Sequence, residues 1–185
     1  SVASDHFDPG HFVDAVSGDF NLDGRFTGRL QAPSGQLTVG GRRLDLAGQA
    51  LDTLALHARL EDRTLWLGRL EAVFAPGEIL ESTGWLKMDR TFDLTLQTNG
   101  IAAANIDRLQ EWFPGQGNLH LDISATGQVA NPDVDGRLKV TDIRINEAAV
   151  DDMDLAFSLH DRQAMLDGNL NFEVDAQCDL RTGNF

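Results

Sequence analysis

Five histidines and many carboxylates are the residues of this chain that could support metal binding or acid–base catalysis. The histidines are His6, His11, His57, His120 and His160. None belongs to a His-Glu-x-x-His pattern, and no second type of ligand lies at metal-binding spacing from them. Paired carboxylates such as Asp151-Asp152 are common in an acidic chain, and acid–base catalysis also needs a desolvated pocket. We therefore expect no catalytic residue, no metal and no cofactor, and we do not expect an enzyme.

Two aspartate-rich segments resemble parts of a calcium-binding loop. Asp19–Gly24 has the spacing of the first half of an EF-hand loop, but Leu30 stands where the loop needs a bidentate glutamate. Asn131–Gly136 is a weaker match, with Asp142 at the twelfth position, where the loop needs the glutamate. Both segments lie inside strand-like patterns rather than between helices, so calcium is the less favoured interpretation.

Charge and cysteine content exclude other classes of function. The 185 residues carry a net charge of −14 and only two lysines, so a phosphate backbone or an anionic membrane surface would repel the chain. A single cysteine, Cys178, excludes a disulfide framework. No signal peptide opens the chain, and no apolar run approaches the roughly 20 residues of a membrane helix. Because the chain stops within a strand-like region, we interpret residues 1–185 as a single fragment of a larger protein, with 1–100 and 101–185 as possible sub-units.

Alternation of apolar and polar residues is the dominant pattern. From Leu166 to Leu180 every even position is non-polar and every odd position is polar, as expected for a half-buried strand. Unbroken, this strand would span about 50 Å. Similar runs recur along the chain and predict an antiparallel meander of about 12 strands. Asp23-Gly24, Gly40-Gly41, Asp135-Gly136 and Asp167-Gly168 are candidates for hairpin turns or for glycine kinks inside long strands, whereas Pro76-Gly77 and Asn131-Pro132 are firmer breaks.

One segment has helical spacing instead. Ile106, Leu109 and Phe113 fall on one helical face, Asn105 is a suitable N-cap, and Pro114-Gly115 would end the helix. We expect one short helix that covers an end of the sheet. The long apolar faces are compatible with an ordinary β-sandwich core, but the length of the strands and the uniformly aliphatic or phenylalanine side chains weigh against it.

Gly117–Leu138 carries the rhythm G-x-L-x-L-x-h-x-A-x-G-x-x-x-N-P-x-x-x-G-x-L, after the expected helix at 105–114. This segment resembles a repeat of the TamB and AsmA-like family of repeating β-groove proteins, and the resemblance extends over roughly residues 100–180. It implies an all-β fold, an antiparallel meander curled into an elongated open trough with one short helix. It also implies a periplasmic segment of an inner-membrane-anchored protein of the Gram-negative envelope.

The family supports outer-membrane biogenesis and phospholipid movement between membranes, so the resemblance implies a hydrophobic conduit. Its partners would be phospholipid acyl chains or unfolded outer-membrane protein, with an outer-membrane partner bound through other parts of the parent protein. An apolar trough with a polar exterior would shield such cargo from water. The residues that we expect to line the groove are Leu119, Leu121, Ile123, Leu138, Val140, Leu155, Phe157, Leu159, Leu166, Leu170, Phe172 and Val174.

A structural rod or adhesin-type passenger domain is the alternative. A β-helix or β-sandwich of that kind would have a closed, dry core.

Overall fold

The computed structural model describes residues 2–7, 16–29, 32–112, 115–145, 148–169 and 173–179. Strands dominate these ranges, and the only helical elements in them are a short 3₁₀ helix, η2, and one helix, α1. In chain order the elements are β1 (Val2–Phe7), β2 (Val16–Arg29), β3 (Ala32–Leu46), β4 (Gln49–Glu61), β5 (Thr64–Ala75), β6 (Glu78–Lys87), β7 (Thr91–Thr98), β8 (Ile101–Ala102), η2 (Ala103–Asn105), α1 (Asp107–Trp112), β9 (Gln116–Gln128), β10 (Asn131–Ile145), β11 (Ala148–Ala149), β12 (Met153–His160), β13 (Gln163–Asn169) and β14 (Glu173–Asp179).

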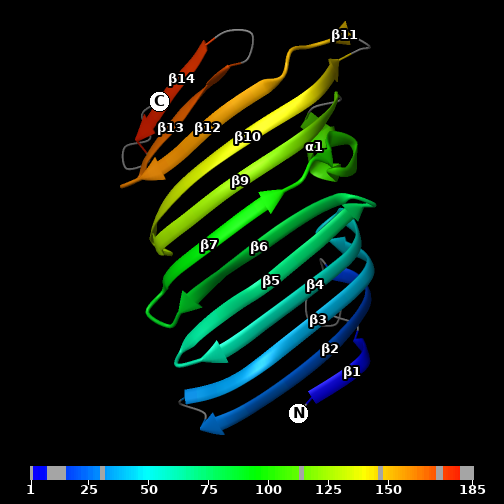
Figure 1. Cartoon of the computed structure of the whole chain (residues 1–185), viewed down its shortest axis with the longest axis vertical. Helices are drawn as coiled ribbons and strands as arrows, with labels where there is room; N and C mark the ends of the chain where they lie inside the picture. Colours follow the sequence, from blue (N-terminus) through cyan, green and yellow to red (C-terminus); the bar gives the residue numbers. More distant parts are fainter. Residues whose placement is uncertain are drawn as a thin grey trace.

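All of these strands belong to one antiparallel sheet. Its order is β1-β2-β3-β4-β5-β6-β7-β9-β10-β12-β13-β14, while β8 pairs with β9 and β11 pairs with β10. The sheet curls lengthwise and does not close on itself, so the strands arch across an open trough (Figure 1). The predicted fold, an all-β meander of about 12 strands with one short helix, is confirmed.

The surface area of the chain is that of an open shape. The chain exposes 12391 Å² of surface. A compact monomer of the same mass, 20.2 kDa, would expose about 8,800 Å². Among the residues with described side chains, none of the large ones is fully buried. A single curled sheet explains both observations, because no second layer of described residues covers its apolar face.

Cross-strand register makes that apolar face continuous. Partners in an antiparallel pair lie on the same face of a sheet. One row runs from Val39 through Leu56 to Leu70. Farther along the sheet, Leu96 faces Ile123 in the same way. On β9 the exposure of side chains alternates strictly from Leu121 to Gln128, with the apolar residues half-buried and the polar ones exposed.

A β-bulge keeps this face apolar on β5. Leu67 and Leu70 are three residues apart and would point to opposite faces of a regular strand. The register against β6 shifts between them, so Leu67 pairs with Gly84 and Leu70 with Ser82. The extra residue therefore returns Leu70 to the face that Leu67 occupies.

The glycine pairs named as turn candidates all lie inside strands. Gly24 is in β2, Gly41 in β3, Gly136 in β10 and Gly168 in β13, so they are positions within long strands and not hairpin turns. At Gly41 an added Cβ would come within 2.8 Å of Leu44 Cδ1, so the glycine permits a close side-chain approach. Pro76-Gly77 does separate β5 from β6, and Asn131-Pro132 opens β10 directly after a turn.

Asp-Arg pairs form several of the turns. Asp62 and Arg63 have φ values of 47° and 60° between β4 and β5, and Asp161 and Arg162 have 49° and 65° between β12 and β13. Two successive positive φ values are those of a type I′ hairpin turn. The turn between β6 and β7 also contains an Asp-Arg pair, with Arg90 at φ 67°.

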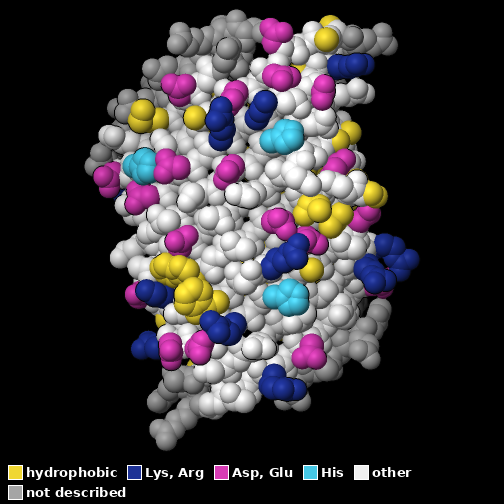
Figure 2. Space-filling view, viewed as in Figure 1, with side chains coloured by type: hydrophobic (Ala, Val, Ile, Leu, Met, Phe, Trp, Pro, Cys, Tyr) yellow, Lys and Arg dark blue, Asp and Glu magenta, His cyan; other side chains and the backbone are white. Residues whose placement is uncertain are grey.

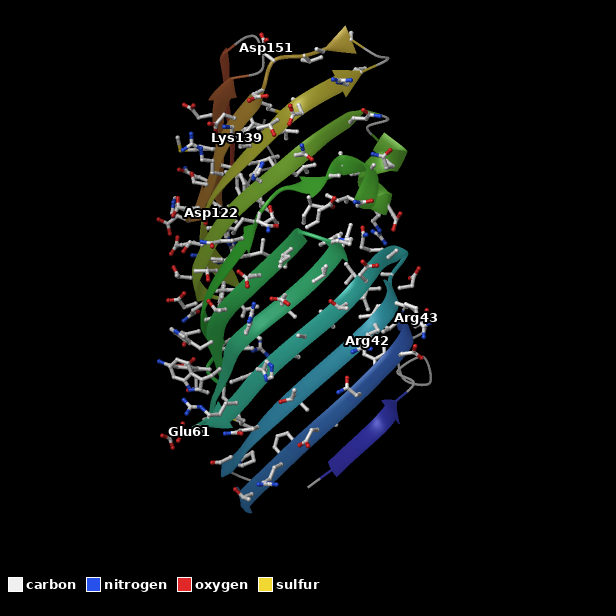
Figure 3. All side chains as sticks on the ribbon, turned by 45° about the vertical axis from the view of Figure 1, so that its right-hand side comes forward. Arg42, Arg43, Glu61, Asp122, Lys139 and Asp151 are labelled. Carbon is white, nitrogen blue, oxygen red and sulfur yellow. The ribbon has the colours of Figure 1, made fainter. Side chains whose placement is uncertain are left out.

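The turns define two rims of the trough. The hairpin rim comprises the turns at 62–63, 88–90, 129–130 and 161–162, and the helix rim comprises the turns at 47–48 and 76–77 together with residues 103–112. Figure 3 shows Glu61 at the hairpin rim and Arg42 and Arg43 toward the helix rim. Each long strand runs from one rim to the other.

The helix lies on its rim as expected, but Asn105 does not cap it. Asn105 ends η2, and its side-chain Nδ2 donates a hydrogen bond of 2.8 Å to Glu78 Oε2. Gln49 Oε1 instead accepts a hydrogen bond from the Asp107 backbone N–H at the start of α1. Tertiary contact with the first residue of β4 thus supplies the acceptor that a local N-cap would supply. The predicted helix members Phe113 and Pro114 lie outside the described residues.

The Leu166–Leu180 segment is not one strand. β13 and β14 form an antiparallel pair in which Leu166 faces Ala176 and Gly168 faces Val174. The two residues of each pair are both even-numbered, so the even-numbered residues of β13 and of β14 lie on the same face of the sheet. The prediction of a single strand of about 50 Å was wrong for this reason.

A packed cluster lies along the helix rim. Phe20, Leu44, Leu51 and Ala72 are buried there, and half-buried neighbours such as Phe74 and Leu80 pack against them. Leu44 retains only 3% of its exposure. No helix in the described part of the chain is long and apolar enough to cross a membrane.

Candidate hydrophobic binding site

An apolar cavity of about 500 Å³ lies on the inner face of the trough, beside the hairpin rim. Its lining contains no polar or charged residue type. The lining residues are Leu37, Leu56, Ala58, Leu65, Leu67, Trp85, Leu86, Phe92, Leu94, Val129 and Pro132.

Strand pairing brings these residues together from six strands and one turn. Ala58 stands between Leu37 on β3 and Leu67 on β5. Leu86 stands between Leu65 on β5 and Phe92 on β7. These are adjacent rows of the same face, and Val129 adds the turn between β9 and β10.

The cavity is open to solvent on one side. Leu65 and Leu86 retain 44% and 41% of their exposure, and Val129 retains 56%. Large apolar side chains that stay this exposed within one lined hollow are typical of a binding surface rather than of a core.

The dimensions of the cavity follow from the strand spacing. It extends from Leu37 on β3 to Pro132 on β10, across six strand-to-strand steps of about 4.8 Å each, or about 29 Å along the sheet. The hydrocarbon layer of one leaflet is about 15 Å thick, half of a bilayer core of about 30 Å. An extended acyl chain therefore fits within the length of the cavity.

The predicted groove residues with described side chains lie on the same apolar face. Leu121 faces Leu138, and Leu138 faces Leu155. Phe157 faces Leu166 on one side and Gly136 on the other, where its ring covers the glycine. Val140 is buried, and the other predicted residues in this group are half-buried: Leu119, Leu121, Ile123, Leu138, Leu155, Phe157, Leu159 and Leu166. Leu170 and Phe172 lie outside the described residues, and Val174 is on β14 opposite Gly168.

None of the nine predicted residues with described side chains lines the cavity. These nine lie on β9, β10, β12 and β13, whereas the cavity is formed mainly by β3 to β7. Shared rows connect the two parts, since Leu94 in the cavity faces Ala125, and Ala125 faces Val134. The alternation of apolar and polar residues over 54–60 and 92–96 indicated strands that form the cavity. The resemblance of residues 117–138 to the family repeat placed the predicted groove on later strands instead.

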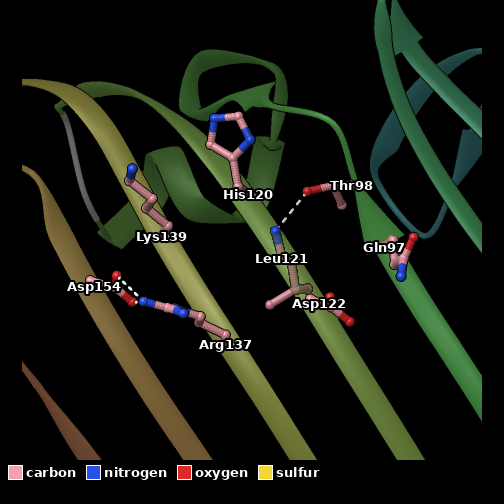
Figure 4. Close-up of a pocket in the computed structure, with 8 residues that line it drawn as sticks. All are labelled: Gln97, Thr98, His120, Leu121, Asp122, Arg137, Lys139 and Asp154. Atoms are coloured by element: carbon pink, nitrogen blue, oxygen red, sulfur yellow. Dashed lines mark hydrogen bonds and ion pairs between the residues drawn. The ribbon is translucent and has the colours of Figure 1, made fainter.

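The outer face of the sheet is polar. Charged and histidine side chains cover it in Figure 2. A second hollow of about 500 Å³ on this face is lined mainly by polar residues of β7, β9, β10 and β12 (Figure 4). There Arg137 forms a bidentate pair with Asp154, at 2.7 Å and 2.6 Å, and this pairing lowers the pKa of the Asp154 carboxyl. Both side chains are thus engaged with each other.

A tryptophan pair interrupts the polar outer surface near the hairpin rim. The ring centroids of Trp66 and Trp85 lie 6.5 Å apart, and Lys87 Nζ lies 4.8 Å from the centroid of Trp85. Aromatic and cation–π contacts of this kind stabilise neighbouring strands. They account for these large side chains on the solvent side.

Among the described residues, no group of three or more His, Cys, Asp or Glu side chains is placed to hold a metal ion. His57 contacts Thr38 and His160 contacts two aspartates. Comparison with family models, with curated proteins and with solved structures finds no match for this chain.

Proposed function

We propose that this chain is a segment of an open trough that holds hydrocarbon chains away from water, with lipid acyl chains as the cargo. The observation that carries the proposal is the wholly apolar cavity of about 500 Å³ on the uncovered inner face. Burial of each CH₂ group contributes about 0.8 kcal/mol. Many such contacts would retain a tail without fixing it at one place, which suits transfer along a trough.

The lining favours an acyl chain over an unfolded polypeptide. A polypeptide carries N–H and C=O groups along its whole length, and each buried group without a partner costs about 1–3 kcal/mol. The cavity side chains offer no such partner, because the indole ring of Trp85 lies with Trp66 on the outer face. An acyl chain has no polar group except at its head, so it avoids this cost.

The cellular setting of the proposal rests on the resemblance of Gly117–Leu138 to the TamB and AsmA-like repeats. On that basis the chain would be a periplasmic part of an inner-membrane-anchored protein that supports outer-membrane biogenesis and phospholipid transport. The single curled sheet is compatible with a conduit. The alternative rod or adhesin required a closed, dry core, and the described strands form one open sheet instead.

A charge placed in the cavity tests the proposal. Leu94→Asp would put a carboxylate among the lining residues, whereas Gln97→Asp would put the same group on the outer face of the same strand. We expect the Leu94 variant to remain folded, because water reaches the open cavity, and to lose most binding of a fluorescent fatty acid. The Gln97 variant should bind like the unmodified chain.

Native mass spectrometry and lipid extraction of the purified chain provide a second measurement. Co-purified lipid, or uptake of the fluorescent fatty acid, supports the trough. A chain that carries no lipid and takes up no acyl probe would overturn the proposed function.

A further inference from the structure

We propose that the hairpin rim selects amphiphiles with an anionic headgroup, through Arg63 and Arg90, while their acyl chain occupies the apolar cavity. This inference rests on the proposed function and adds the class of headgroup to it. It starts from the position of two arginine-bearing turns beside a cavity with no charge of its own.

Backbone hydrogen bonds join the two arginine turns to the cavity wall. The Met88 N–H donates to the Arg63 carbonyl at 3.1 Å, and the Val129 N–H donates to the Arg90 carbonyl at 3.0 Å. Arg63 is two residues from the lining residue Leu65, and Arg90 is two residues from Phe92. The turns therefore form one connected lip at the open edge of the cavity.

The charge of this lip contrasts with that of the whole chain. Residues 59–63 and 87–90 contain four cationic and three anionic side chains, in a chain of net charge −14. Two of the three carboxylates already have partners: Glu61 pairs with Arg59 at 3.3 Å, and Asp89 accepts hydrogen bonds from the Thr91 backbone and hydroxyl. Lys87 lies over Trp85.

Arg63 and Arg90 remain exposed and have no ion-pair partner among the described residues. Asp62 is the one carboxylate of the lip without a side-chain partner among the described residues. It offsets only one of the two arginines, so the lip keeps a net positive charge. A carboxylate or phosphate at the end of a tail in the cavity would complement it.

The test compares a fluorescent fatty acid with its methyl ester, which has the same tail but a neutral head. Both are titrated at low salt and at a pH well above the pKa of a carboxylic acid. Exposed ion pairs contribute modestly, so we expect the acid to bind about 3- to 10-fold more tightly than the ester. High salt should remove this preference.

Arg63→Asn and Arg90→Asn remove the charges and keep the turns, because asparagine tolerates the left-handed backbone at φ 60° and 67°. We expect the double variant to lose the preference for the acid and to bind the ester unchanged. Arg162→Asn is the matched control, since Arg162 occupies an Asp-Arg turn with φ 65° that does not line the cavity.

Each outcome is informative. Equal binding of acid and ester, or an equal loss of preference in the Arg162 control, would overturn the role of the two arginines while the acyl trough stands. Displacement of the acid by inorganic phosphate, beyond a chloride control of the same ionic strength, would assign the lip to a free anion instead of an amphiphile. Failure of both probes to bind the unmodified chain would overturn this inference together with the proposed function.

Discussion

The two rims of the trough are built from the same strands and differ in how they treat apolar side chains. At the helix rim Leu44 and Leu51 retain 3% and 6% of their exposure, in a cluster that Phe20 and Ala72 complete. At the hairpin rim Leu65 and Leu86 retain more than 40%. The helix rim therefore stabilises the fold, and the hairpin rim leaves its apolar surface available.

The two rims also differ in the segments that connect their strands. Residues 103–107 fold over the helix rim and are held there by Gln49 and Glu78. In the described part of the chain the hairpin rim has tight turns, and the one turn residue that lines the cavity there is Val129. An open sheet without a second layer can thus remain stable when its apolar face is buried along the helix rim and left exposed along the hairpin rim.

The largest effect that tests this comparison is the loss of a buried leucine. Leu44→Ala should lower the free energy of unfolding by about 2–5 kcal/mol, because Leu44 fills the space above Gly18 and Gly41. Leu65→Ala should lower it by about 1 kcal/mol or less, since much of that side chain is already in water. Urea denaturation of both variants measures the difference. Equal losses would mean that the hairpin rim is also a packed core.

A smaller effect should follow from releasing the helix. Gln49→Ala removes the hydrogen bonds to the Asn105 carbonyl and from the Asp107 N–H, a loss of about 1–2 kcal/mol. Hydrogen exchange should then rise over residues 103–110, while uptake of an acyl probe at the hairpin rim stays unchanged. Gln36→Ala is the control, because Gln36 is exposed on the outer side of β3. A loss of acyl uptake in the Gln49 variant would show that the two rims are not independent.

The sequence predicted the sheet well because alternation is a local property. Each strand of the row from Leu56 to Leu96 carries its apolar face in its own residues, and hairpin pairing then aligns these faces. The turns were harder to predict. Asp62-Arg63 and Asp161-Arg162 adopt the backbone usually associated with Asn-Gly, while the glycine pairs serve close packing inside strands.

Features that depend on distant residues could not be predicted from local patterns. The acceptor for the first N–H of α1 comes from Gln49, 58 residues before Asp107, so Asn105 was the reasonable local choice. The contacts that hold residues 102–107 on the helix rim likewise come from Gln49 and Glu78, which lie far away in the sequence.

The smallest expected effect concerns His160, on the outer face close to the hairpin rim. Its Nε2 lies 3.1 Å from Asp135 Oδ1, and its Nδ1 lies 3.3 Å from Asp133 Oδ1. Hydrogen bonding to Asp135, and then to Asp133, raises the pKa of His160 above its ordinary value of 6.5. The folded state therefore holds the proton more tightly than the unfolded state. The resulting stabilisation is fully present below the ordinary pKa of histidine and is lost as the pH rises through the raised pKa.

NMR titration of the His160 ring should show a midpoint above 6.5, and the melting temperature should decrease slightly as the pH is raised through that midpoint. His160→Gln should remove this dependence, and the effect should be small because half of the side chain is exposed to solvent. His57→Gln is the control, since the partner of His57 is the Thr38 hydroxyl and not a carboxylate. Binding of a neutral acyl ester should not change in either variant, because both histidines lie on the polar face. A change in ester binding over the same pH range would mean that the outer face influences the trough, and the division between the two faces would fail.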